Sequence, residues 1–299
     1  MTDRSSLEAR SFLFVPAGSE RFVAKAATRG ADVIVLDLED GVAPAAKAEA
    51  RASLVRSVPM LRGFGAVVYV RVNNETELLD SDVEAALTAG AQGIVMPKVD
   101  APEQLIQLNQ KMAGCGADRA IGIVGLVESP VGIGRLSEIA RSTPQLRGLC
   151  FGSEDFATAM GVEPSPDSLS WPAHALAIAA VAAGVQPLGL VGSVANFTDI
   201  AAYRELVTQS RRIGMRGATC IHPAQVAVLN QVFSASDLQI AEAEMLLALF
   251  EAAVREGKGA IAVNGRMVDE PVAKRARLLL QRENARQVSG WLNSGSNVR

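Results

Sequence analysis

The feature that most constrains the fold of this chain is a series of eight short apolar runs separated by helix-patterned segments. The runs occupy residues 11–17, 33–40, 66–73, 93–99, 121–129, 146–155, 186–191 and 218–223. Most are continuously apolar rather than alternating, which is typical of parallel strands buried on both faces. Between them lie segments with apolar residues at helical spacing, such as 20–28, 82–89, 102–112 and 198–213. Eight strands with intervening helices predict a (β/α)₈ TIM barrel of the α/β class.

The composition suits such a barrel and excludes several classes of partner. Hydrophobic residues make up 49% of the chain and aromatic residues 4%, so small aliphatic side chains have to fill the core. The net charge of −3 offers no basic excess for nucleic acid or an anionic membrane surface. No apolar run reaches membrane-spanning length, and three distant cysteines suggest no disulfide framework. We therefore expect a cytoplasmic protein with neither a nucleic-acid nor a membrane partner.

The pattern changes after the eighth run. A long amphipathic helix is predicted over residues 236–256, and a second helix is predicted from Pro271 to about Val288. The small and polar residues 257–269 between them are interpreted as a flexible link. The sequence thus predicts a barrel domain over residues 10–232 and a C-terminal helical arm over residues 236–288. This arm would cap the barrel or reach a neighbouring subunit.

Polar and charged residues end most of the apolar runs, and the C-terminal ends of the strands are where a β/α barrel builds its active site. These residues are Asp37, Glu39, Asp40, Arg71, Asn73, Lys98, Glu128, Ser153, Glu154, Asp155 and His222. Carboxylates from separate strands, in a chain with only two histidines, suit a hard cation such as Mg²⁺. An arginine beside the cation would bind a carboxylate in a bidentate way. The combination fits a 2-oxo or 2-hydroxy acid, although many other chemistries fit it too.

Several of these residues also have a purely structural interpretation. Glu39 and Asp40 could cap the following helix. Arg71 could be a structural ion-pair partner of Glu39 or Glu128, and Lys98 could be a charge on the rim. Glu128 more strongly favours a ligand, because it follows an apolar strand where an unpaired carboxylate would be costly to bury.

Two further positions stay open on the residues alone. Glu154 and Asp155 are adjacent, and the sequence does not show which of them faces the site. His222 precedes a proline at the end of the last apolar run and is interpreted as a hydrogen-bonded residue of the strand end rather than a catalyst.

A series of short motifs, taken together, resembles the citrate lyase β-subunit-like family of the HpcH/HpaI aldolase/citrate lyase superfamily, which includes malyl-CoA and citramalyl-CoA lyases. The motifs are RSFLFVP at 10–16, DVIVLDLED at 32–40 with Lys47 and Ala50-Arg51, VRVN at 70–73, MPK at 96–98, VES at 127–129, GSEDF at 152–156, IHPAQ at 221–225 and DEP at 269–271. Each motif is short, but their order over about residues 10–230 is specific.

The resemblance implies a (β/α)₈ barrel that binds Mg²⁺, with a role for each matched residue. Glu128 and Asp155 would be the metal ligands, which selects Asp155 over its neighbour. Arg71 would bind the substrate carboxylate and act in catalysis. Glu39 and Asp40 would be further catalytic carboxylates, placed behind the ligands or holding a water.

Other residues follow from the same resemblance. Lys98, with Phe14 and Pro16 of the opening strand, would contact the substrate. Asp269 would be a catalytic residue that the C-terminal arm delivers to a neighbouring subunit's barrel. The implied assembly is a homotrimer or a multiple of it.

The implied activity is a Mg²⁺-dependent carbon–carbon lyase. It would cleave or form a 3-hydroxyacyl-CoA of the malyl, citramalyl or citryl type, giving an acyl-CoA and a 2-oxo acid, with CoA as part of the substrate. A pyruvate-class metal-dependent aldolase acting without CoA is one alternative, and departures from the family pattern near residues 173, 189 and 218 favour it. A non-catalytic metal-binding barrel or scaffold subunit is another, and the joint presence of Glu128, Asp155, Arg71 and Asp269 argues against it.

Overall fold

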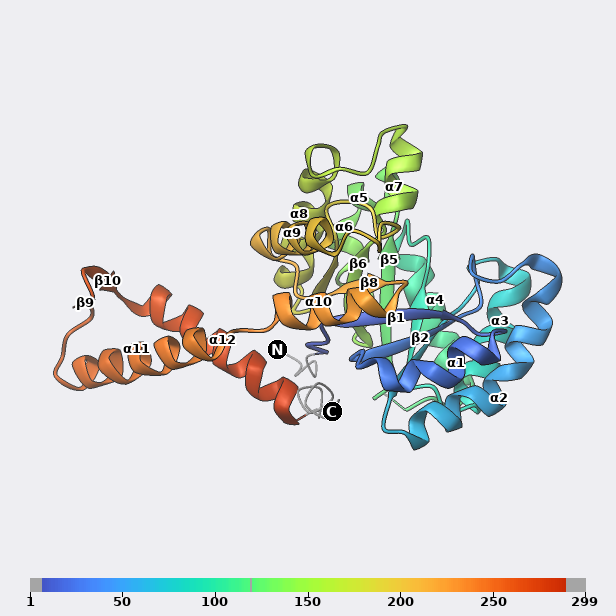
Figure 1. Ribbon diagram of the computed structural model, residues 1–299, viewed down its shortest axis with the longest axis horizontal. Helices are drawn as coiled ribbons and strands as arrows, with labels where there is room; N and C mark the ends of the chain where they lie inside the picture. The colour runs from blue at the N-terminus through green and yellow to red at the C-terminus, as the bar shows by residue number, and fades with distance from the viewer. Residues whose placement is uncertain (1–6, 119, 289–299) are drawn as a thin grey trace. The chain divides into compact units, whose positions relative to one another are not determined.

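The computed structural model describes residues 7–118 and 120–288. The chain divides into two compact units, Met1–Phe233 and Ser234–Arg299. The first unit consists of parallel strands surrounded by helices, and the second is built mainly from two helices (Figure 1).

The first unit is a nearly closed barrel of eight parallel strands, as predicted. The strands are β1 (Ser11–Pro16), β2 (Val33–Asp37), β3 (Val67–Arg71), β4 (Gly93–Met96), β5 (Gly122–Val127), β6 (Leu146–Phe151), β7 (Gln186–Gly189) and β8 (Ala218–Cys220). Their order is β7-β6-β5-β4-β3-β2-β1-β8, so consecutive strands pair and β1 also pairs with β8. The amide of Gly189 donates to the carbonyl of Gly217 at 2.9 Å, and the amide of Arg216 donates to the carbonyl of Pro187 at 3.0 Å. These bonds link β7 to the segment that enters β8.

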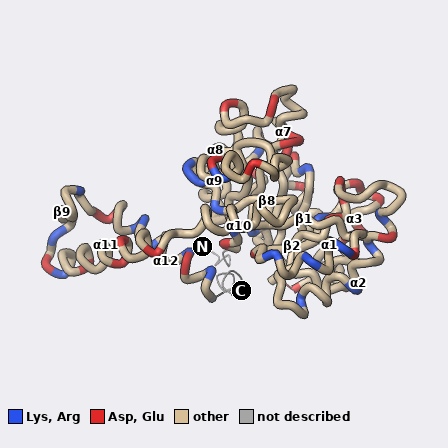
Figure 2. Tube along the Cα trace, viewed as in Figure 1, with Lys and Arg blue, Asp and Glu red and all other residues tan. Residues whose placement is uncertain are grey.

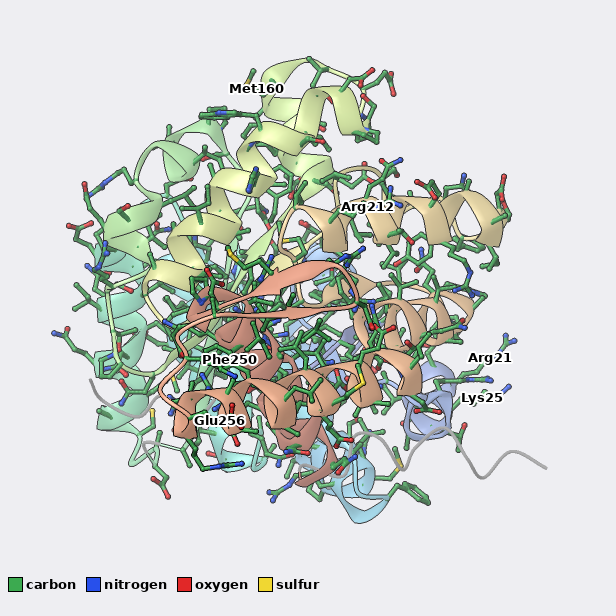
Figure 3. The ribbon with its side chains drawn as sticks, turned by 90° about the vertical axis from the view of Figure 1, so that its left-hand side faces the viewer. Arg21, Lys25, Met160, Arg212, Phe250 and Glu256 are labelled. Atoms are coloured by element: carbon green, nitrogen blue, oxygen red, sulfur yellow. The ribbon has the colours of Figure 1, made fainter. Side chains whose placement is uncertain are left out.

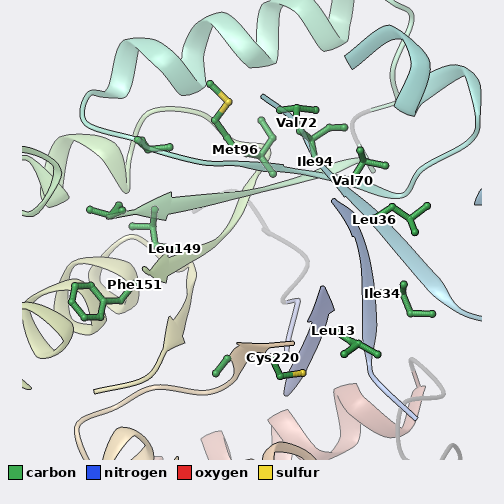
Figure 4. Close-up of a cluster of buried hydrophobic side chains, with 14 of the residues drawn as sticks. Leu13, Ile34, Leu36, Val70, Val72, Ile94, Met96, Leu149, Phe151 and Cys220 are labelled. Carbon is green, nitrogen blue, oxygen red and sulfur yellow. The ribbon is translucent and has the colours of Figure 1, made fainter. Parts of the chain in front are cut away.

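Helices fill the segments between the strands, as predicted, and one more helix follows β8. They are α1 (Glu20–Ala26), α2 (Lys47–Gly63), α3 (Thr76–Thr88), α4 (Pro102–Gly114), α5 (Pro130–Gly134), α6 (Leu136–Ile139), α7 (Ser153–Met160), α8 (Pro166–Ala182), α9 (Ile200–Arg212) and α10 (Pro223–Phe233). Strands β2, β4, β5 and β7 are buried along their whole length, which explains why their sequences are apolar without alternation. Figure 4 shows side chains from successive strands, Ile34 and Ile94 among them, gathered in one buried layer.

Tyr69 fills part of the barrel interior. Its ring meets Phe12 of β1 edge to face, with 6.3 Å between the ring centroids. A Cβ at Gly93 of β4 would lie 2.2 Å from the Tyr69 ring, and one at Gly122 of β5 would lie 3.0 Å from its hydroxyl oxygen. Side chains of β1 and β3 can meet the backbones of β4 and β5 only on the concave face of the sheet. The two glycines therefore leave room for the Tyr69 ring in the barrel interior.

We expect Gly93→Ala to destabilise the protein by about 1–3 kcal/mol, because the new methyl group would overlap the Tyr69 ring. Thermal unfolding of the two proteins measures this. Gly114→Ala is the matched control, since nothing lies within 4 Å of its added Cβ and Gly114 ends helix α4, so its melting temperature should stay the same or rise. Equal melting temperatures for Gly93→Ala and the wild type would show that Tyr69 does not fill this space.

The second unit contains α11 (Asp237–Arg255), α12 (Glu270–Val288) and a hairpin of β9 (Ile261–Val263) and β10 (Arg266–Val268). The hairpin corrects the prediction of a flexible link over 257–269. Asn264 and Gly265 form its turn with φ of 49° and 74°, the left-handed values that a two-residue Asn-Gly turn requires. Phe250, Val268 and Ala273 form the core of this unit, to which α11, β10 and α12 each contribute.

Within residues 7–118 and 120–288, no helix combines the length and hydropathy that crossing a bilayer requires.

Candidate active site

The C-terminal ends of β2 to β6 carry most of the residues predicted for the site. Arg71 is the last residue of β3, and Glu39 and Asp40 follow β2. Lys98 lies two residues beyond β4, and Glu128 directly follows β5. Because the strands are parallel, these ends lie at one rim of the barrel.

Arg71 is held by Asp37, the neighbouring residue in the β2–β3 register. Its Nε and Nη2 donate to Oδ1 and Oδ2 of Asp37, each at 2.7 Å, and its Nη1 lies 2.7 Å from Glu39 Oε2. The guanidinium carbon lies 4.9 Å from the centroid of the Phe14 ring. Burial lowers the pKa of Arg71, but hydrogen bonds and charge from Asp37, with the charges of Glu39 and Asp40, outweigh burial and raise it. The guanidinium therefore stays charged and fixed.

This arrangement defines how Arg71 can bind a ligand. Asp37 occupies the Nε–Nη2 edge and also accepts from the amides of Glu39 and Gly41, each at 2.9 Å, so it is fully used. The Nη1–Nη2 edge still has N–H groups for an incoming carboxylate, with Glu39 as the competing acceptor. The sequence offered Glu39 or Glu128 as a structural ion-pair partner of Arg71, and the structure confirms Glu39. Asp37, the bidentate partner, was not assigned a separate role. Its place at the end of the second apolar run, on the same rim as Arg71, was the only signal in the sequence, because the register that pairs the two residues is seen only in the structure.

Glu39 lies between the two cations of the rim. It is 3% exposed, and its Oε1 accepts from Lys98 Nζ at 2.5 Å. Burial raises the pKa of Glu39, and the charges of Arg71 and Lys98 lower it. Asp40 is more exposed and contacts the same cations at longer range, 3.7 Å from Arg71 and 3.6 Å from Lys98. Both predicted carboxylates are therefore part of one charged cluster rather than caps of the next helix.

Lys98 occupies its place at a conformational cost. Its φ is +52°, a left-handed value that is uncommon outside glycine. Asn74 Nδ2 and Gln104 Nε2 donate to the Lys98 carbonyl at 3.1 and 2.9 Å and hold the backbone in this conformation. The side chain itself is 47% exposed, so its ammonium is open to a ligand as well as to Glu39.

Glu128 and Asp155 form the candidate metal site. Glu128 is 7% exposed, and its Oε2 has no hydrogen-bond partner in the described part of the chain. A Cβ at Gly152 would lie 2.5 Å from Glu128 Cγ, so this glycine makes room for the carboxylate. Burial raises the pKa of Glu128 to about 8, with the charge and a hydrogen bond of Asp155 adding to the effect. A buried carboxylate with an unpartnered oxygen beside a second carboxylate fits a divalent cation. The cation would offset the desolvation of Glu128 and its repulsion by Asp155.

The donor set matches Mg²⁺ rather than a metal that needs a protein cage. No group of three or more His, Cys, Asp or Glu side chains that could hold a metal occurs among the residues that the structure describes. Mg²⁺ is usually bound by one or two carboxylates and completes its shell with waters or substrate oxygens. Two carboxylates, one of them exposed, meet that requirement.

The structure also separates Glu154 from Asp155 in helix α7. Glu154 Oε1 accepts from Ser193 Oγ at 2.5 Å and from the Val194 amide at 3.0 Å, so this carboxylate fastens the loop after β7. Asp155 is exposed and faces Glu128. Only Asp155 is thus free to share a cation with Glu128.

A cavity of about 650 Å³ opens at the same rim. Its lining includes Phe14, Pro16, Asp37, Asp40 and Arg71. It continues along helix α1 and the 3₁₀ turn Ala27–Arg29 that extends it, where Arg21, Lys25 and Arg29 line it, and along the Ile221-His222-Pro223 turn. Figure 2 shows the basic positions along α1, and Figure 3 shows the Arg21 and Lys25 side chains next to each other. The predicted substrate residues Phe14 and Pro16 line this cavity, whereas Lys98 and Glu128 do not. Asp155 lines a separate hollow of about 80 Å³.

Asp269 belongs to the second unit. It precedes α12, where its Oδ1 accepts from the Val272 amide at 3.3 Å and its carbonyl accepts from the Ala273 amide at 3.0 Å. This is the geometry of a helix N-cap, a role that the sequence did not predict. Its delivery to another subunit's barrel stays a prediction.

Comparisons with known proteins agree with this site and with the motifs of the sequence. Residues 10–223 match the HpcH/HpaI aldolase/citrate lyase family. The citrate lyase subunit beta of Escherichia coli K12 is 32% identical, with 94% of this chain and 95% of the relative covered. An L-malyl-CoA/beta-methylmalyl-CoA lyase of Cereibacter sphaeroides is 30% identical, with 91% and 93% covered. The crystal structure of CitE from Mycobacterium tuberculosis, in complex with magnesium, acetoacetate and coenzyme A, is 29% identical, has a TM-score of 0.74, and is matched over 94% of this chain and 99% of that one.

The resemblance predicted from the short motifs is therefore confirmed. The chain belongs to the HpcH/HpaI aldolase/citrate lyase family.

Proposed function

We propose that this protein is a Mg²⁺-dependent carbon–carbon lyase that cleaves or forms a malyl-, citramalyl- or citryl-type CoA thioester. The products of cleavage are an acyl-CoA and a 2-oxo acid. The observation that carries the proposal is the buried Glu128 with its unpartnered oxygen, facing Asp155 at the rim where Asp37 holds Arg71. The names of the relatives, a citrate lyase subunit and a malyl-CoA lyase, support this reaction class.

Glu128 and Asp155 would hold the Mg²⁺, and the magnesium in the related CitE structure supports this choice of metal. When bound there, Mg²⁺ supplies a Lewis acid that polarises substrate oxygens and lowers the pKa of a coordinated hydroxyl. The Nη1–Nη2 edge of Arg71 would bind the substrate carboxylate as a bidentate pair, which requires the carboxylate to displace Glu39 from Nη1. Phe14 and Asp37 keep that edge in place, so the substrate is bound in one orientation.

The chain also has a candidate for the proton transfers. Cleavage begins when the 3-hydroxyl group loses its proton. The bond between the carbon that bears this hydroxyl and the carbon next to the thioester carbonyl then breaks, which gives the 2-oxo acid and a thioester enolate. Asp269 from a neighbouring subunit would accept the hydroxyl proton and return it to the enolate carbon, which yields the acyl-CoA. This role requires an oligomer, and we propose a homotrimer or a multiple of it.

The cavity favours a CoA thioester over the aldolase alternative. Arg21, Lys25 and Arg29 are spaced four residues apart along α1 and its 3₁₀ extension, so they fall on one side of the helix, where they line the cavity. Three cations along a cavity that begins at Arg71 suit a long ligand with phosphates at its far end. A small 4-hydroxy-2-oxo acid has no phosphates for these cations to bind.

The triple variant Arg21→Gln/Lys25→Gln/Arg29→Gln tests this part of the proposal. We expect its KM for a malyl-CoA-type thioester to rise by about tenfold or more, since each tenfold corresponds to about 1.4 kcal/mol of lost binding. The KM for the matching pantetheine thioester, which lacks the phosphates, should not change. Arg212→Gln is the control, because Arg212 is an exposed arginine of α9 outside the cavity. Turnover of 4-hydroxy-2-oxo acids with no turnover of any thioester would contradict the proposal.

A further inference from the structure

His222 borders the same cavity as Arg71 and the α1 cations, yet the chemistry proposed above gives it no role. It lies two residues beyond Cys220, which pairs with Leu13 of β1. The side chain therefore sits at the strand ends, beside the opening strand that carries Phe14 and Pro16.

Two contacts fix the orientation of the imidazole. The Ala224 amide donates to Nδ1 at 3.2 Å, so Nδ1 carries no proton and Nε2 carries the N–H. The Phe197 ring stacks on the imidazole, with centroids 4.7 Å apart and an angle of 17° between the planes. Nothing in the described part of the chain accepts a hydrogen bond from Nε2.

The backbone around His222 is held equally firmly. Gln225 is fully buried, and its Oε1 accepts from the amides of Ile221 and His222, each at 3.0 Å. Its Nε2 donates to the Val194 carbonyl at 2.8 Å and so ties this turn to the loop that carries Phe197. A side chain with a fixed tautomer, a fixed ring plane and a fixed backbone is preorganised to donate one hydrogen bond.

The surroundings indicate what would accept that bond. Leu13, Val15, Ile221 and Pro223 give the cavity an apolar wall beside the imidazole, and the cations of α1 are available for phosphates. A neutral donor beside an apolar wall suits an uncharged acceptor carried on a flexible chain.

We propose that His222 is a substrate-positioning residue whose Nε2–H donates to a carbonyl oxygen on the arm of the bound thioester. The oxygen belongs either to the thioester group or to an amide of the pantetheine chain. This inference rests on the proposed lyase function and adds a specificity residue that Arg71 and the metal ligands do not supply.

Two isosteric substitutions test it. His222→Asn keeps an acceptor at the position of Nδ1 and loses the distal donor, whereas His222→Gln places an amide N–H near the position of Nε2. We expect His222→Asn to lower kcat/KM for the CoA thioester by about tenfold, as the loss of one hydrogen bond predicts. His222→Gln should restore most of the loss. Phe197→Ala should lower the same ratio by a smaller factor, and Phe197→Tyr, which keeps the stack, should not.

Calorimetric titration with free CoA identifies the acceptor. Weaker CoA binding by His222→Asn, in proportion to its loss of kcat/KM, assigns an amide of the pantetheine chain. Unchanged CoA binding with reduced turnover assigns the thioester carbonyl. Wild-type kcat/KM for His222→Asn would overturn the inference, as would equal losses in both His222 variants with a lowered melting temperature. A wild-type protein that turns over no CoA thioester would overturn the proposed function and this inference together.

Discussion

Glu128→Gln is expected to stabilise the metal-free protein at pH 8 while removing the response to Mg²⁺. At that pH about half of the folded wild-type protein carries the charge on this buried carboxylate beside Asp155 and the rest has taken up a proton, and both cost stability. Glutamine has the same shape without the charge. The melting temperature without metal should therefore rise. Mg²⁺ should raise the melting temperature of the wild type and leave that of the variant unchanged. Activity should fall by on the order of 100-fold or more, since even residues behind metal ligands contribute about 10–100-fold.

The pH dependence of this effect has a defined sign. Glu128 has a pKa of about 8 in the folded protein against an ordinary value of 4.5. Between these values the folded state binds a proton that the unfolded state does not, so its contribution to stability falls as the pH rises from about 4.5 to about 8. The melting temperature of Glu128→Gln relative to the metal-free wild type should increase across this window and level off above it.

Glu154→Gln is the matched control, one position before Asp155 in the same helix. Its carboxylate accepts from Ser193 and Val194, so the variant should keep the Mg²⁺ response and lose only some stability. A Glu128→Gln protein that still responds to Mg²⁺ like the wild type would show that Glu128 is not a metal ligand.

Asp269→Asn is expected to lose activity by on the order of 100-fold or more without losing stability. Asparagine caps a helix about as well as aspartate, so the N-cap of α12 survives, but the group can no longer carry a proton. Asp269→Ala should lose the activity and also about 1 kcal/mol of stability. Steady-state rates and thermal unfolding of both variants separate the capping role from the catalytic one.

Coexpression of Asp269→Asn with Glu128→Gln tests whether the aspartate comes from a neighbour. Each variant lacks a different part of the site, and a mixed oligomer in which subunits share sites would contain some sites with both groups intact. We therefore expect the mixture to recover part of the activity that neither variant has alone. No recovery in mixed oligomers, or full activity of Asp269→Asn, would refute delivery by a neighbouring subunit.

The barrel was predictable because its signal is repeated along the chain. Each continuously apolar run corresponds to a strand buried on both faces, and a misplaced strand end does not change the order of the elements. The ends were less accurate: the run 146–155 combines β6 with the first turn of α7, because Ser153 and its neighbours carry no signal that separates a strand end from a helix start. The hairpin of the second unit was missed although Asn264-Gly265 is a strong turn signal, because the flanking strands have only three residues each.

The candidate site was predictable as a set of charges but not as a set of pairs. The sequence places Arg71, Glu39 and Lys98 at strand ends, and the structure brings them into one cluster. That Asp37 holds the edge of Arg71 depends on the register of β2 against β3, which no local pattern specifies. The choice between Glu154 and Asp155 likewise depends on a loop 39 residues away that supplies Ser193.

We propose that the protein splits a CoA thioester with Mg²⁺ bound to Glu128 and Asp155. Release of free 2-oxo acid from malyl-, citramalyl- and citryl-CoA, measured with Mg²⁺ and after its removal by a chelator, tests this most directly. We expect at least one of the three thioesters to be cleaved, with the rate lost on chelation and restored by added Mg²⁺. Cleavage that persists without the metal, or no release from any thioester beside active turnover of 4-hydroxy-2-oxo acids, would contradict it.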